Sequence, residues 1–143
     1  MIQYLSSSKK TNIETLYQKI SYFPQFQLII SSWFSHTYIM TNDDFLSEIE
    51  LIHSRIVNTK SNKILFDFKQ FDFFISPTLL SQYIKNHDTE IKTLTIKKIA
   101  LILPENNIVK MSIEQVFEYL QDLVNYSSHS FLTIQPALQW LKK

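Results

Sequence analysis

Apolar and polar positions along the chain follow two periods, which separate strands from helices. The segments 63–68 and 98–103 are short and almost continuously apolar, which predicts strands covered on both faces. The segments 14–22 and 25–34 are rich in residues that favour strands, and Phe23-Pro24-Gln25 between them predicts a hairpin turn. The first half of the chain therefore predicts a hairpin, followed later by two central strands.

Helical spacing fills the segments between these strands. Thr41 is a good helix N-cap, and the apolar stripe behind it predicts a helix over 43–57. Ser76-Pro77 predicts a second helix start, with the helix ending near residue 85. Ser112 with Gln115 has the form of a capping box, which predicts a third helix from there to about Asn125. The last predicted elements are a short strand over 130–134 and a short helix over 136–141.

The resulting order is β-β-α-β-α-β-α-β-α, which is typical of an α/β fold. Strands that alternate with helices favour right-handed crossovers, so we expect a mixed, largely parallel sheet of five strands, opened by the hairpin and covered by about four helices. The polar, serine-rich residues 1–12 predict a disordered N-terminus, and 13–143 predict a single domain. Asn58, Asn86 and Asn125 each fall near a predicted helix end, where asparagine tolerates the left-handed conformation.

Composition excludes several classes of protein. The chain has no glycine, which removes the P-loop and the dinucleotide-binding fingerprint, and no cysteine, which removes disulfides and thiolate metal sites. A formal net charge of +1 offers no strong field for nucleic acid. No apolar run is long enough for stable membrane insertion, and residues 1–10 lack the features of a secretory signal. We therefore expect a cytoplasmic protein.

The stretch 63–84, KILFDFKQFDFFISPTLLSQYI, together with the order of elements, resembles STAS-like domains. This group includes bacterial antagonists of anti-sigma factors and small stand-alone relatives, and the resemblance covers about residues 14–142. In the family a buried strand ends in a polar turn, and the helix that starts there carries a regulatory serine and the partner-binding surface. The resemblance implies a bacterial, non-enzymatic regulatory domain that binds another protein.

The chain departs from the family at the phosphorylated turn. Pro77 stands where the regulatory serine is expected, and Ile75 replaces the acidic residue of the motif. Ser76 remains, and its expected role is to cap the helix that follows. We therefore expect a STAS-like domain of a subgroup without the usual phosphoserine switch.

Five phenylalanines lie within the nine residues 66–74, beside this turn. Alternation along an extended chain means that Phe71, Phe73 and Phe74 cannot all point into one core, so one or more of them is expected to line a contact surface or a pocket. The candidate site for a partner or ligand comprises Phe71, Asp72, Phe73, Phe74, Ser76, Pro77 and Thr78. The leading hypothesis is binding of a protein partner, and the alternative is carriage or sensing of a small apolar, lipid-like molecule.

Catalytic and metal-binding residues are weakly indicated. Asp67 and Asp72 flank the end of a predicted central strand and form the best acid/base pair in the chain, but no nucleophile or oxyanion device accompanies them, so we expect no enzyme. The four histidines are scattered: His53 is placed on the polar side of its helix and His87 beyond a helix end, which predicts structural roles. We therefore expect no metal and no cofactor.

The first predicted strand leaves an open sheet edge if nothing covers it. Open edges pair readily with other strands, so homodimerisation is a further expectation.

Overall fold

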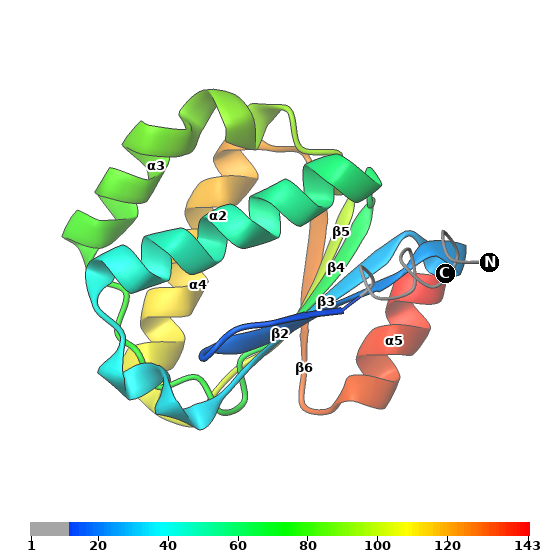
Figure 1. Cartoon of the computed structure of the whole chain (residues 1–143). Coiled ribbons are helices and arrows are strands. Elements are labelled where there is room, and N and C mark those ends of the chain that lie inside the picture. Colours follow the sequence, from blue (N-terminus) through cyan, green and yellow to red (C-terminus); the bar gives the residue numbers. More distant parts are fainter. Residues whose placement is uncertain (1–11) are drawn as a thin grey trace, which may run out of the picture.

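Six strands form one mixed sheet that is layered between helices (Figure 1). This computed structural model describes residues 12–143. The strands lie in the sheet in chain order, and their bounds are β1 Asn12–Glu14, β2 Gln18–Phe23, β3 Leu28–Trp33, β4 Lys63–Asp67, β5 Lys98–Ile102 and β6 Ser127–Phe131. The pairs β1–β2 and β2–β3 are antiparallel, and β3 to β6 are parallel to one another. The predicted fold class, a largely parallel sheet opened by a hairpin, is confirmed.

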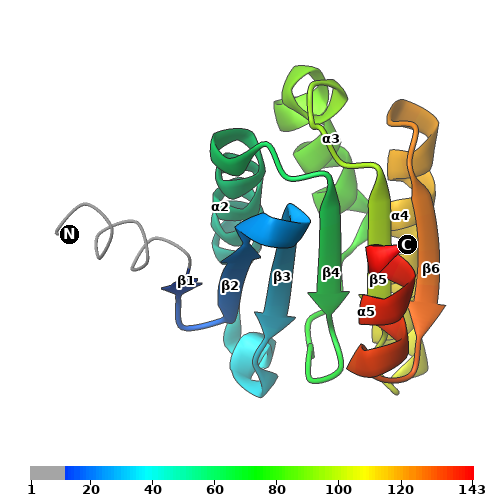
Figure 2. The ribbon, with the colours of Figure 1, turned by 90° about the vertical axis from the view of Figure 1, so that its right-hand side faces the viewer.

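Three of the four helices cover one face of the sheet and the fourth covers the other (Figure 2). Their bounds are α2 Asn42–Thr59, α3 Pro77–Lys92, α4 Asn107–Leu123 and α5 Ile134–Lys142, and the short 3₁₀ segments are η1 Pro24–Phe26 and η2 Ser35–Ile39. Each crossover from β3 to β6 moves one place along the sheet, so right-handed connections put α2, α3 and α4 on the same face. The helix α5 follows the last strand and packs against the opposite face.

Alternation along the strands supplies both cores. In β4, Ile64 and Phe66 pack in the larger core under α2, α3 and α4, whereas Leu65 packs in the smaller core with Ala137 and Leu141 of α5. A strand that is buried on both faces reads as a continuous apolar run, and for this reason the pattern at 63–68 identified a central strand.

The sheet has six strands rather than the five that the sequence predicts. The predicted strand 14–22 is broken because the Thr15 hydroxyl accepts hydrogen bonds from the backbone N–H groups of Tyr17 and Gln18, which makes a turn there. Residues before the turn form β1, which pairs with the outer edge of β2. The expectation of homodimerisation assumed an open edge at the first predicted strand. Within residues 12–143 the three residues of β1 pair with Lys19, Ile20 and Ser21 of β2, and β1 is the terminal strand of the sheet, so homodimerisation stays a prediction. The predicted disordered segment 1–12 lies outside the described residues except for Asn12, which belongs to β1.

The predicted helix ends are wrong in two places. The helix α3 continues to Lys92 instead of ending near residue 85, so Asn86 lies inside it. The helix α4 begins at Asn107, where the Asn106 side chain caps it, and the predicted cap Ser112 is a buried interior residue. The predicted left-handed asparagines are also wrong, because the positive φ angles among the described residues belong to Gln27 and to Lys60, which ends α2.

Candidate functional site

The four parallel strands all end at one edge of the sheet, at the bottom of Figure 2. We call it the carboxyl edge. Open α/β sheets commonly bind ligands at this edge, because the loops that leave it are free of the ladder hydrogen bonds. The predicted site residues 71–78 lie in the loop that leaves β4 here and in the first turn of α3.

The loop begins by turning aromatic side chains back into the core. The Asp67 carboxylate accepts the N–H of Lys69, and the N–H of Phe71 donates to the carbonyl of Phe68, which makes a tight turn. Phe68 and Phe71 then pack on the buried Trp33, with ring centroids 6.1 and 5.2 Å away. These contacts account for Phe71 as a core residue.

The three phenylalanines that follow β4 differ in burial, as the sequence predicts. Phe71 is buried, Phe73 is half-buried and stacks on Phe45 of α2 at 5.4 Å, and Phe74 keeps 49% of its surface exposed. Of the three, Phe74 is therefore the one available to a partner.

Two buried hydroxyls hold the loop in place. The N–H of Asp72 donates to Thr37 Oγ1 of η2 at 2.8 Å, and the N–H of Ile75 donates to Ser112 Oγ of α4 at 3.2 Å. Thr37 and Ser112 are both buried. The exposed Phe74 thus sits between two anchored backbone positions.

Ser76, Pro77 and Thr78 form the start of α3. Ser76 Oγ accepts the N–H of Leu79 at 3.1 Å, and Pro77 occupies the first helical position, which confirms the predicted cap. Pro77 and Thr78 are exposed beside Phe74. Asp72 is also exposed, whereas the Asp67 carboxylate serves its turn, so the two carboxylates have separate surroundings.

Exposed apolar side chains gather along the carboxyl edge. Seven of the twelve large hydrophobic residues that are exposed in 12–143 follow the ends of the parallel strands: Tyr38, Ile39, Phe74, Ile108, Met111, Leu132 and Ile134. We call these seven residues the carboxyl-edge patch. Leu132 is 92% exposed, and beside it lies a shallow hollow of about 310 Å³ between the end of β6 and the loop that precedes α4. Large exposed apolar side chains that gather in one region mark contact sites more often than scattered ones do.

An internal cavity of about 90 Å³ lies under α2, α3 and α4 against β4 and β5. Its lining is apolar except for His53, Tyr83 and Tyr126, and it does not include Phe71, Phe73 or Phe74. Cavities that hold drug-sized ligands measure roughly 300–1,000 Å³. The cavity volume is therefore well below the volume that a lipid-like ligand needs.

The predicted surroundings of two histidines are wrong. His53 is 4% exposed and lies between α2 and α3, instead of on a polar helix face. His87 lies within α3, because that helix continues to Lys92, and Glu90 one turn later faces the same neighbour. Burial lowers the pKa of His53 although Glu90 opposes the shift, and burial raises the pKa of the neighbouring Tyr83. The sequence signal for the group of His53, His87 and Glu90 was the three-residue spacing of His87 and Glu90. That spacing places them on one helix face only if the helix continues past residue 85, where the prediction ended it.

Comparisons of the chain with family profiles, curated proteins and solved structures gave no match. The resemblance to STAS-like domains therefore stays a prediction. Within residues 12–143, none of the helices combines the length and the apolar character that crossing a membrane requires.

Proposed function

We propose that this chain is a non-enzymatic interaction domain that binds a protein partner through the carboxyl-edge patch. The observation that carries the proposal is the gathering of exposed apolar residues after every one of the four parallel strands. A regulatory role of the STAS-like type, without the phosphoserine switch, and a cytoplasmic location are part of the same proposal.

The arrangement of the loop after β4 supports this function. A binding surface loses less entropy on association when its side chains are already held in position. The anchors at Thr37 and Ser112 hold the backbone on either side of Phe74, while the capped start of α3 continues the surface through Pro77 and Thr78. Ser76 Oγ is committed to the cap, which fits a surface that recognises shape and apolar area instead of a phosphate.

The alternative, carriage of a small apolar molecule, has one observation in its favour, the apolar internal cavity. At about 90 Å³ the cavity is smaller than an engineered cavity of about 150 Å³ that takes up benzene. A lipid-like ligand would require the three covering helices to separate. The carboxyl-edge patch requires no such change, and we therefore prefer the interaction domain.

Charged substitutions in the patch test the proposal. Phe74→Asp and Leu132→Asp place a carboxylate on two exposed positions after different strands, and Tyr119→Asp makes the same change on exposed α4 surface outside the patch. Affinity capture from the native host, with quantitative mass spectrometry, should recover a partner with the unaltered chain and with Tyr119→Asp. That partner should be lost with either patch variant.

Two results would contradict the proposal. One is that the unaltered chain and all three variants recover the same proteins. The other is that the unaltered chain enriches no protein relative to Phe74→Asp and Leu132→Asp. Circular dichroism of each variant controls for folding. Native mass spectrometry of the unaltered chain tests the alternative, because a bound species of a few hundred daltons would favour a carrier.

A further inference from the structure

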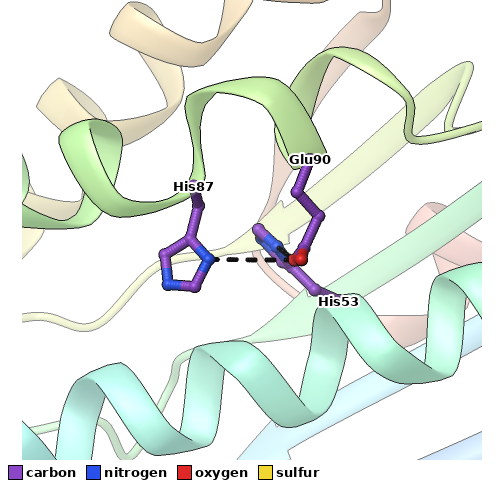
Figure 3. A group of neighbouring side chains, drawn as sticks. All are labelled: His53, His87 and Glu90. Carbon is purple, nitrogen blue, oxygen red and sulfur yellow. Dashed lines mark hydrogen bonds and ion pairs between the residues drawn. The ribbon is translucent and has the colours of Figure 1, made fainter.

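Three side chains that can bind metal converge between α2 and α3. His53 projects from α2, and His87 and Glu90 project from successive turns of α3 toward it (Figure 3). One nitrogen or oxygen atom from each of the three lies within 4.8 Å of the others. The group lies in the second half of both helices, whereas both helices begin at the carboxyl edge.

The distances within the group centre on the Glu90 carboxylate. His53 Nδ1 lies 2.5 Å from Glu90 Oε1, and His87 Nδ1 lies 3.8 Å from the same oxygen. Ligand atoms of a tetrahedral zinc ion, with bonds of roughly 2.0–2.2 Å, are separated by about 3.3 Å. One observed separation is shorter and the other longer than this value, and all three atoms lie within 4.8 Å of one another, so binding one ion requires the side chains to adjust.

A simple hydrogen bond between His53 and Glu90 explains only part of the arrangement. It accounts for the buried His53, but it does not involve His87, whose side chain is 12% exposed. His87 makes no hydrogen bond within residues 12–143, and its Nδ1 is directed at a carboxylate that is already engaged. The His87 ring packs against His53 and Tyr83, both with ring centroids 5.5 Å away, and this packing does not require its Nδ1 to face the carboxylate. Three potential ligand atoms within 4.8 Å of one another indicate a site for an ion.

The neighbour of His53 also suits a metal ligand. Metal-binding histidines usually donate the second ring N–H to a polar group, which fixes the ring orientation. His53 Nε2 lies 2.8 Å from the Tyr83 hydroxyl, which can donate to that nitrogen in the metal-free protein or accept from its N–H when Nδ1 binds an ion. Glu90 is 44% exposed, so an ion and a water molecule can reach the group from solvent.

We propose that His53 Nδ1, His87 Nδ1 and one oxygen of Glu90 bind a divalent first-row transition ion of the zinc type, with a water molecule completing the coordination. Two imidazoles and one carboxylate suit zinc and its neighbours better than calcium or magnesium, which prefer oxygen ligands. The ion would join α2 to α3, and the site is independent of the function proposed for the carboxyl edge.

The test is to remove metal from the full chain with a chelator, to titrate the chain with zinc chloride, and to measure the heat of binding by isothermal titration calorimetry. We expect one ion per chain and a rise in the thermal midpoint with added zinc. Cobalt at the same stoichiometry should give the visible absorption of a tetrahedral complex.

Glu90→Gln and His87→Ala separate a metal site from a hydrogen-bonded pair. The amide oxygen of glutamine can still accept from His53, so Glu90→Gln keeps the contact between the helices but weakens the ligand. Each variant should weaken zinc binding by more than about 100-fold, the upper end of the loss for a residue that only orients a ligand. Tyr83→Phe should weaken it by about 10–100-fold.

Asp88→Asn is the matched control, because Asp88 lies on the same helix and pairs with Lys92 at 3.3 Å outside the group. It should bind zinc as the unaltered chain does. The proposal fails if the unaltered chain shows no one-to-one binding, if Glu90→Gln and His87→Ala bind as tightly as the control, or if Asp88→Asn loses binding equally. Circular dichroism of the metal-free variants ensures that a loss of binding is not a loss of folding.

Discussion

The Ser112 hydroxyl offers the sharpest test of how the carboxyl edge is held. It lies inside α4, donates to the carbonyl of Val109 at 2.7 Å and accepts the N–H of Ile75 at 3.2 Å. Ser112→Ala removes both hydrogen bonds, and Ile75 is 5% exposed, so its N–H has little access to water. The loop after β4 then loses one of its two anchors.

The expected cost follows from the unpaired N–H. A buried donor without a partner costs about 1–3 kcal/mol, and alanine recovers about 0.5 kcal/mol as the better helix former. The free energy of unfolding should fall by about 0.5–2.5 kcal/mol, which corresponds to about 2–10 °C in the thermal midpoint for a chain of this length. Urea titration followed by circular dichroism and by tryptophan fluorescence measures the change.

Ser81→Ala, at an exposed position of α3, is the control and should change stability by less than about 0.5 kcal/mol. Hydrogen exchange at the Ile75 amide supplies a local measurement, and its protection should fall in Ser112→Ala more than at core amides. If Ser112→Ala kept full stability and full protection of Ile75, the loop would be held by its phenylalanine contacts, and the anchor argument would be wrong.

Two further predictions concern the ends of α2. Lys60→Gly should raise the free energy of unfolding by about 0.5 kcal/mol. The left-handed conformation at φ 54° costs a non-glycine residue about 1–2 kcal/mol, and the entropy that glycine loses on folding offsets about half of that gain. In the same urea titration the control Lys85→Gly, inside α3, should lower the free energy of unfolding by about 1 kcal/mol. Hydrogen bonds from Thr41 hold the pKa of Asp44 below its ordinary value, so its stabilising contribution is present at neutral pH and is lost as the pH falls through the pKa of the folded state. Asp44→Asn should therefore make the unfolding free energy depend less steeply on pH below about pH 5, and an unchanged slope would refute this assignment.

The elements with the strongest local signals were predictable from the sequence. The strands β4 and β5 are buried on both faces, so each reads as an apolar run, and at five residues each run is too short for a typical helix. The start of α2 was equally clear, because the Thr41 hydroxyl accepts the N–H of Asp44 and the Asp44 carboxylate accepts the N–H of Thr41, which is the capping box in its reciprocal form. In both cases a local preference and the tertiary structure agree.

The errors arose where tertiary contacts outweighed local preferences. Asn86 is a plausible helix end by composition, but Ile91 beyond it is 1% exposed in the core, and burial of that side chain favours continuing α3 by about two turns. The group of His53, His87 and Glu90 depends on that continuation. Because the predicted helix ended before His87 and Glu90, the prediction did not place these two residues on one helix face beside His53, and the proposed metal site was missed.

The absence of glycine changes how the carboxyl edge must be built. Loops usually use glycine where the backbone turns sharply, yet none of the loop residues 68–76 has a positive φ angle. Its shape comes instead from a carboxylate-capped turn at its start, aromatic side chains that pack inward and hydroxyls at Thr37 and Ser112 that accept its N–H groups. The loop is held by side chains from β3, η2, α2 and α4 and moves with them, so a partner bound at Phe74 would be coupled to η2 and α4 as well as to the strand it follows.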